Sequence, residues 1–137
     1  MRELVEDYVA RASRLVPTAV RELRASVAGD ESRRKSEDMV AVRAAAAGAT
    51  AVLLTERGAA WDSPRLAGFL GERIDRGAGP TVFLCGGEAG FHSEEEGWAA
   101  ERVALSRFTM PHELARVVLS EQVYRALMHY RNRRYHR

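Results

Sequence analysis

The chain has 137 residues, of which 46% are hydrophobic, so its apolar mass suffices for one core and we expect a single domain over residues 1–137. Charged residues make up 29% and prolines number only four, which excludes extensive disorder. No apolar run approaches the ~20 residues that span a bilayer, and the N-terminal residues lack the core of a signal peptide. The lone cysteine, Cys85, can form no internal disulfide, so we expect a soluble protein of the reducing cytoplasm.

The net charge of +2 is unevenly distributed along the chain. Residues 44–100 hold four Lys/Arg and eight Asp/Glu, whereas residues 101–137 hold eight and three. A basic C-terminal segment of this kind favours a polyanion such as nucleic acid as partner. The alternative is a solvated helix end whose cations complement the helix dipole.

In the first part of the chain, spacing predicts a helix over residues 4–16, a strand over 20–27, a loop over 29–38, a helix over 39–48 and a strand over 51–55. Pro17 would end the first helix, and Gly48 would cap the second. The strand at 51–55 is a continuous apolar run, which is typical of a strand covered on both faces.

In the second part, the pattern predicts a helix over residues 63–74, a strand over 81–85, a short helix from Ser93, a strand over 103–106 and a helix over 112–129. Ser63 precedes Pro64 and is expected to cap the first of these helices. Glutamates 94–96 would occupy the first turn of the short helix. Strands alternating with helices predict an α/β fold in which a parallel sheet lies between helices.

Ligands in parallel α/β sheets gather beyond the carboxyl ends of the strands. Here those ends are expected at Thr55, Cys85 and Ser106, followed by loops at residues 56–58, 86–90 and 107–111. The glycines at 86, 87 and 90 match neither the dinucleotide fingerprint nor a phosphate loop, so a structural turn and a ligand loop both remain open. The four histidines show no metal-ligand spacing, and we expect no metal.

The expected terminal helix has two kinds of face. One face is apolar and suited to packing, and a second apolar stripe would suit a homodimer seam. The other face carries Glu121, Tyr124, Arg125 and Met128 at helical spacing. A tyrosine and an arginine beside a glutamate can orient a nucleobase or form a surface ion pair, and packing is the favoured interpretation from spacing alone.

Four ordered blocks resemble one known family. They are Phe83-Leu84-Cys85-Gly86-Gly87-x-x-Gly90, Leu105-Ser106-Arg107-Phe108-Thr109-Met110-Pro111-His112, Arg116-Val117-Val118-Leu119-x-Glu121-Gln122-Val123-Tyr124-Arg125-Ala126 and Tyr135-His136-Arg137. The turn Trp61-Asp62-Ser63-Pro64 fits as well. The chain thereby resembles the ribosomal RNA large subunit methyltransferase H family, SPOUT-class enzymes that methylate N3 of a pseudouridine in bacterial 23S ribosomal RNA.

The resemblance implies a deep trefoil knot, a homodimer, S-adenosylmethionine as cofactor and large-subunit ribosomal RNA, within the ribosome, as partner. Carried over by position, it implies a cofactor site lined by Leu54, Gly86, Leu105, Ser106, Arg107, Phe108, Thr109 and Met110. Members of the family begin with a strand and a short turn, whereas this sequence begins at the helix that follows, so we expect the first strand to be lacking.

Methylation at N3 requires loss of the N3 proton, because the neutral nitrogen is a poor nucleophile. The candidate bases are His136 and Glu121, and Arg125 or Arg134 would stabilise the developing anion. Tyr124 or Tyr135 would stack on or hydrogen-bond the base. Two alternatives differ in class: a catalytically impaired knotted module that binds RNA, and a nucleotide-binding α/β enzyme that acts on a metabolite.

Overall fold

The computed structural model describes residues 1–86, 91–92 and 97–135. Its elements, in chain order, are α1 (Arg2–Ser13), α2 (Glu31–Ala45), β1 (Thr50–Ala60), α3 (Ser63–Asp75), β2 (Thr81–Cys85), β3 (Glu101–Ala104) and α4 (His112–Tyr135). They form two compact units. The helical unit comprises residues Met1–Arg21, Trp61–Ala78 and Glu113–Arg137, and the sheet unit comprises Glu22–Ala60 and Gly79–His112.

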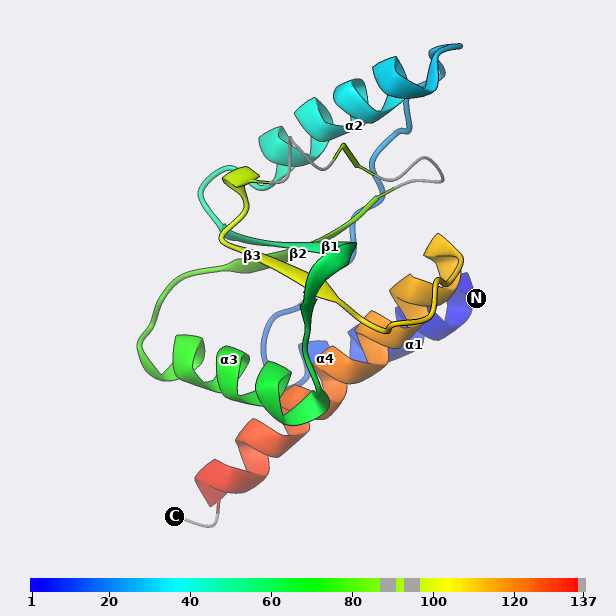
Figure 1. The fold of residues 1–137 in the computed structure, drawn as a ribbon. Helices are drawn as coiled ribbons and strands as arrows, with labels where there is room; N and C mark the ends of the chain where they lie inside the picture. The colour runs from blue at the N-terminus through cyan, green and yellow to red at the C-terminus, as the bar shows by residue number, and fades with distance from the viewer. Residues whose placement is uncertain (87–90, 93–96, 136–137) are drawn as a thin grey trace. The chain divides into compact units, whose positions relative to one another are not determined.

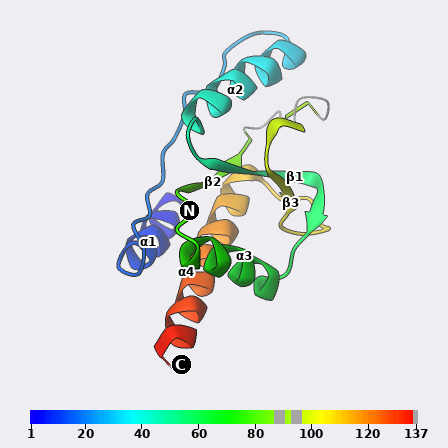
Figure 2. The same cartoon turned by 90° about the vertical axis from the view of Figure 1, so that its left-hand side faces the viewer.

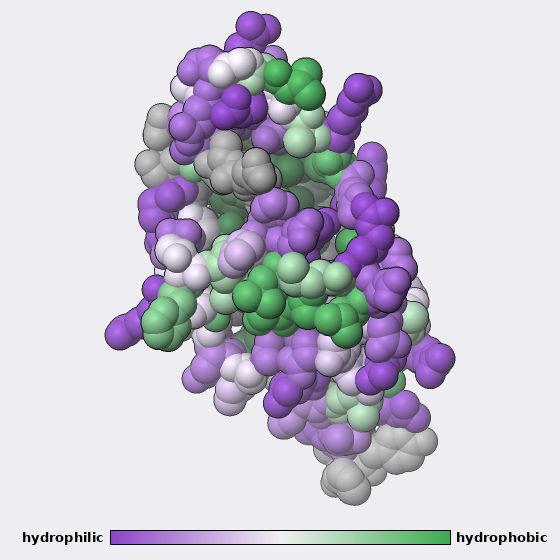
Figure 3. Space-filling view, turned by 90° about the vertical axis from the view of Figure 1, so that its right-hand side faces the viewer, coloured by the Kyte–Doolittle hydropathy of each residue, from purple (hydrophilic) through white to green (hydrophobic). Residues whose placement is uncertain are grey.

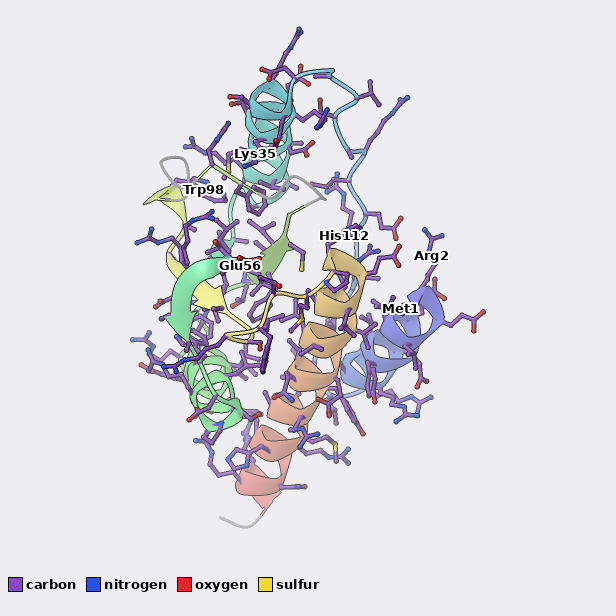
Figure 4. All side chains as sticks on the ribbon, turned by 45° about the vertical axis from the view of Figure 1, so that its right-hand side comes forward. Met1, Arg2, Lys35, Glu56, Trp98 and His112 are labelled. Atoms are coloured by element: carbon purple, nitrogen blue, oxygen red, sulfur yellow. The ribbon has the colours of Figure 1, made fainter. Side chains whose placement is uncertain are left out.

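The sheet unit is built on three parallel strands in the order β2-β1-β3. Helix α2 lies on one face of this sheet in both views (Figures 1 and 2). The cluster that joins them consists of Met39, Val42 and Ala46 from the helical segment and Ala51, Leu53, Leu84 and Phe91 from the sheet side. Trp98 adds a contact from the loop before β3, where its indole Nε1 donates a hydrogen bond to the sulfur of Met39 at 2.9 Å (Figure 4). The predicted parallel α/β architecture is thus confirmed for this unit.

β1 is longer than the predicted strand and contains an irregularity. Leu54 and Ala59 both pair with Val103, so residues 55–58 bulge out of the ladder. Gly58 lies against the backbone of β3, where a Cβ atom would stand 2.5 Å from the nitrogen of Val103. The strand can pass β3 this closely because position 58 has no side chain.

The helical unit consists of α1 and α3 packed against the 24-residue α4. The rings of Tyr8 on α1 and Tyr124 on α4 lie 6.1 Å apart. Further along α4, the Tyr130 hydroxyl donates to Oδ1 of Asp75 at the end of α3, over 2.9 Å. Hydrophilic residues predominate around the C-terminal end of α4 (Figure 3).

Two glycines of α3 offer a matched test of this packing. Gly68 is exposed and has open space around it, whereas a Cβ at Gly71 would stand 3.2 Å from Nη2 of Arg133 and 3.3 Å from Cδ2 of Tyr130. Gly68→Ala should therefore stabilise the protein by about 0.5–1 kcal/mol through helix propensity. Gly71→Ala should gain less, because its methyl group crowds α4. Chemical denaturation measures both, and equal gains would contradict close packing of α3 on α4.

Two local predictions are wrong, and both concern residues 20–38. No strand forms at residues 20–27, where Val27 is 92% exposed. The backbone N–H of Ser26 donates to Oδ1 of Asp38 at 2.8 Å, and the Ser26 hydroxyl bonds to Glu37, so the segment is tied to α2 instead of a sheet. This hydrogen bond from Ser26, with the charge of Arg33, holds the pKa of Glu37 below its usual value.

Residues 31–38 of the loop predicted at 29–38 form the first half of α2. Asp30 caps the helix by accepting from the N–H of Arg33, and pairs at i,i+4 spacing follow within it, namely Glu31 with Lys35 at 3.6 Å and Arg33 with Glu37 at 3.2 Å. A polar sequence thus becomes helical through its cap and its ion pairs. Hydrophobic periodicity, the signal used for the prediction, cannot detect such a helix.

Several boundaries also differ from the prediction. β1 ends at Ala60 rather than Thr55, β3 at Ala104 rather than Ser106, and α4 at Tyr135 rather than His129. The cap of α3 is Asp62, whose carboxylate accepts from the N–H of Arg65 at 2.8 Å, and not Ser63. The short helix predicted from Ser93 falls on residues 93–96, which lie outside the described part of the chain.

Candidate cofactor and catalytic residues

The register of the sheet brings Leu54, the last residue of β1 before its bulge, level with the carboxyl ends of β2 and β3. Leu54 pairs with Cys85 of β2 and with Val103 of β3. Gly86 follows Cys85 directly, and Leu105 lies two residues after Val103, so both stand at the same edge as Leu54. All three residues, Leu54, Gly86 and Leu105, are half-buried. This edge is where ligands bind in parallel sheets.

The turn after β3 supplies the other predicted cofactor residues. The Ser106 hydroxyl accepts a hydrogen bond from the backbone N–H of Phe108 at 2.9 Å, which fixes the start of the turn. Arg107, Phe108 and Thr109 are exposed, with Phe108 85% exposed, whereas Met110 is half-buried. An exposed aromatic ring beside half-buried apolar side chains can contact a flat heterocycle. The glycine-rich stretch at residues 87–90 lies outside the described residues.

The bulge in β1 falls on the ligand loop expected at residues 56–58, for which no individual site residue was named. Glu56 is exposed on the bend of β1 (Figure 4). The Arg57 guanidinium donates to the carbonyl of Phe91 at 3.1 Å, and its backbone N–H donates to the Thr55 hydroxyl at 3.3 Å. The bulge is thus tied to the loop after β2. A Gly at position 58 was the available signal, since glycine within a strand pattern often marks a bulge.

In the helical unit, Glu121 and Arg125 form a close ion pair. Nε and Nη2 of Arg125 donate to Oε1 of Glu121 at 3.1 and 2.5 Å. The hydrogen bond to Glu121 and the charge of that carboxylate raise the pKa of Arg125 above its already high value. Arg125 is therefore a permanent cation whose guanidinium is oriented by Glu121.

Two further residues extend this pair into a chain of hydrogen bonds. Gln122 donates from Nε2 to Oε2 of Glu121 at 2.9 Å, and its carbonyl oxygen accepts from the Ser63 hydroxyl at 2.5 Å. The chain runs from the first turn of α3 through Ser63, Gln122 and Glu121 to Arg125. Sequence reasoning missed Ser63 and Gln122 because the serine was interpreted as a helix cap.

The remaining catalytic candidates have different surroundings. Tyr124 is half-buried and its ring lies near that of Tyr8, so a packing contact accounts for it. Nη1 of Arg134 donates to the hydroxyl of Tyr130 at 3.1 Å, and this guanidinium lies 5.7 Å from the Tyr130 ring centre. Tyr135 is the last residue of α4; its side chain, like the whole of His136, lies outside what the structure describes.

The described residues include no candidate for a metal-binding cluster or for a membrane-spanning helix. Among them, no group of three or more His, Cys, Asp or Glu side chains is arranged to hold a metal ion. None of the helices described is both long enough and apolar enough to cross a membrane.

Comparison with known proteins identifies the family to which the chain belongs. A family model described as "Predicted SPOUT methyltransferase" matches residues 1–136. Three proteins named ribosomal RNA large subunit methyltransferase H are similar to this chain. That of Citrifermentans bemidjiense is 36% identical over 126 residues, covering 91% of this chain and 82% of its own. That of Geobacter sp. (strain M21) is 34% identical, with 99% and 89% covered. That of Allorhizobium ampelinum is 33% identical, also with 99% and 89% covered. On these matches, and with the parallel sheet described above, the chain belongs to the SPOUT methyltransferase family.

Proposed function

We propose that this enzyme transfers a methyl group from S-adenosylmethionine to N3 of a pseudouridine in bacterial 23S ribosomal RNA, within the ribosome. The observation that carries the proposal is the register of Leu54 with Cys85 and Val103, which puts the matching segments of the family at one sheet edge. Relatives named ribosomal RNA large subunit methyltransferase H support the RNA substrate. The pseudouridine and its N3 atom follow from the resemblance described above.

The residues at the sheet edge fit S-adenosylmethionine. The half-buried side chains of Leu54, Leu105 and Met110 offer apolar surface, and Gly86 leaves its backbone open to close approach. The turn from Ser106 to Thr109, fixed by the Ser106 hydroxyl, adds backbone groups and the exposed Phe108 ring. When bound, the cofactor supplies a methyl group on a positively charged sulfur. The protein must hold the accepting nitrogen in line with that bond.

The proton at N3 is removed, in this proposal, by His136. Glu121 is the other candidate, but both of its oxygens already accept hydrogen bonds, from Arg125 and Gln122. These contacts favour a different role for Glu121, in which it orients Arg125. Arg125 or Arg134 would stabilise the developing negative charge. Of the two tyrosine candidates, Tyr135 would position the nucleobase, because Tyr124 packs against Tyr8.

Replacing His136 with alanine should slow methyl transfer by about 100-fold or more, the range for loss of a general base. The affinity for S-adenosylmethionine should stay unchanged, because His136 is not among the proposed cofactor residues. Single-turnover rates and calorimetric titration measure the two quantities. Turnover equal to that of the unmodified enzyme would eliminate His136 and return the role to Glu121.

The proposal includes a knotted single domain that dimerises and works in the cytoplasm. The family match supports the knot. Support for the dimer comes from α4, where Val117, Val118, Leu119 and Val123 are only half-buried and Leu114 is 40% exposed. An apolar helix face that one chain leaves partly uncovered is suited to a second copy.

Calorimetric titration with S-adenosylmethionine tests the proposal first, with the mass in solution measured alongside. Saturable binding by a dimer is expected, followed by transfer of labelled methyl to ribosomes that lack the modification. Absence of cofactor binding by the folded protein would contradict the proposal. Binding to RNA without methyl transfer would identify the impaired RNA-binding module instead.

A further inference from the structure

Aromatic rings and guanidinium groups alternate along one face of α3 and the residue that precedes its cap. Arg65, Phe69 and Arg73 lie on α3 at a spacing of four residues, which places them above one another. Trp61 lies just before the helix and continues the row through its contacts with Arg65 and Phe69. The Arg65 guanidinium lies 5.1 Å from the Trp61 ring centre, and that of Arg73 lies 5.8 Å from the centre of Phe69. The two rings are 5.1 Å apart. We call these four residues the aromatic–arginine ladder.

The ladder is not the packing face of α3. The buried residues of the helix are Leu66, Ala67, Leu70 and Gly71. In the ladder, Arg65 is exposed, while Trp61, Phe69 and Arg73 are half-buried. Part of each ring therefore remains accessible to solvent. The position of Arg73 is further fixed by its hydrogen bond to the carbonyl of Ala78 at 3.2 Å.

The charges around the ladder favour an anionic partner. The helical unit holds thirteen Lys/Arg and eight Asp/Glu, a formal charge of +5, whereas the sheet unit holds eight and eleven. The acidic side chains of α3 are engaged elsewhere: Glu72 pairs with Arg76 at 3.6 Å, and Asp75 accepts from Tyr130 and Arg133. Asp62 caps the helix. These three carboxylates thus have partners of their own outside the ladder.

We propose that the aromatic–arginine ladder is a binding surface for unpaired RNA, on which bases stack against Trp61 and Phe69 while Arg65 and Arg73 contact phosphates. Aromatic rings interleaved with arginines are how proteins bind single-stranded nucleic acid, since every base has a face that stacks. This inference rests on the function proposed above and deepens it by adding a second RNA contact besides the basic C-terminal segment, residues 101–137. The ladder would hold RNA that flanks the target nucleotide.

Fluorescence of Trp61 gives a direct test. The chain has two tryptophans, and Trp98→Phe leaves Trp61 as the sole reporter. A 20-nucleotide single-stranded RNA of mixed sequence should quench this fluorescence on binding. In the otherwise unmodified protein, Trp61→Leu should weaken RNA binding, measured by anisotropy, at least fivefold, which is the low end for losing one stacked base. The logarithm of the RNA association constant falls linearly with the logarithm of the salt concentration, and Arg65→Ala should make this slope shallower by about 0.7. That is the value for the loss of one phosphate contact to a single strand.

Arg76→Ala is the matched control. It removes a cation from the end of the same helix, but Arg76 pairs with Glu72 and lies outside the ladder, so RNA affinity should change less than twofold. Thermal melting and the affinity for S-adenosylmethionine should be unchanged in Arg65→Ala, which separates RNA binding from folding. Arg65→Lys should restore the salt slope.

Three outcomes separate this inference from its competitors. The inference would be overturned if RNA did not quench the fluorescence of Trp61 and if Trp61→Leu bound RNA as tightly as the unmodified protein does. A loss of methyl transfer to ribosomes without any loss of affinity for the RNA would also overturn it, because the ladder would then contact a ribosomal protein. If the ladder binds RNA but the protein does not bind S-adenosylmethionine, the proposed methyl transfer fails and the RNA-binding surface stands.

Discussion

Gly58→Ala is expected to destabilise the protein by about 1–3 kcal/mol, the cost of forcing an extra methyl group into a packed site. The added Cβ would stand 2.5 Å from the nitrogen of Val103 and 2.6 Å from the carbonyl carbon of Arg102. Both atoms are backbone, so no side chain can rotate away. β1 and β3 must separate, and the register that brings Leu54, Gly86 and Leu105 to one edge is disturbed. The affinity for S-adenosylmethionine should therefore fall together with the melting temperature.

Gly29→Ala is the control for this substitution. Gly29 lies in the same unit, has no atom within 4 Å of its would-be Cβ and does not adopt a positive φ, so its replacement should change the melting temperature little. Differential scanning calorimetry measures both variants. A Gly58→Ala protein that melts like the unmodified one would show that β1 does not pass this close to β3.

Arg125→Ala should lower kcat for methyl transfer by about 100-fold, the effect of removing a preorganised charge from a developing anion. The bond to Glu121 raises the pKa of Arg125, so the guanidinium is charged at every working pH and the loss should not vary with pH. Arg125→Lys keeps the charge but cannot reproduce two N–H bonds to one carboxylate, and it should recover only part of the rate. Single-turnover kinetics on ribosomes, across a range of pH, gives these values.

The control for Arg125 is Arg14→Ala, which removes an exposed cation at the end of α1. Its kcat should match that of the unmodified enzyme. Ser63→Ala tests the far end of the hydrogen-bond chain and should lower kcat less than Arg125→Ala does. A rise in KM with unchanged kcat in Arg125→Ala would contradict a role in the reaction and indicate simple RNA binding.

The parts of the fold that could be predicted are those whose burial is indicated by a run of apolar residues in the sequence. The apolar runs at 51–55 and 81–85 became β1 and β2 because strands covered on both faces need continuous apolar sequence. Residues 31–38 were mistaken for a loop because their helix is stabilised by the Asp30 cap and ion pairs. The run from Val20 to Val27 alternates loosely like a strand, yet Val27 is 92% exposed and Ser26 is hydrogen-bonded to Asp38 and Glu37 of α2 instead of to a sheet.

The candidate site likewise has one part that could be predicted from the sequence and one part that could not. The rule on carboxyl ends predicted that the loops after three strands would meet at one edge, and the family resemblance supplied Leu54, Gly86 and Leu105 there. The register places these three residues at one edge. The ion pair of Glu121 with Arg125 was one of the alternatives that helical spacing offered. The hydrogen bond between Ser63 and Gln122 could not be predicted, because these residues are 59 positions apart in the sequence and meet only through helix packing.

The hydrogen bonds at the end of α4 have a consequence for how tightly its arginines can bind. The last turns of a helix ordinarily fray, but here Asp75 accepts from both Tyr130 and Arg133, and Tyr130 in turn accepts from Arg134. Arg133 and Arg134 are thus partly immobilised before any phosphate arrives. A side chain that is already ordered loses less conformational entropy when it binds. A smaller part of the favourable enthalpy of each contact is therefore offset, and the binding free energy is more favourable. The end of α4 is preorganised for an anion, and Asp75, itself acidic, provides that order.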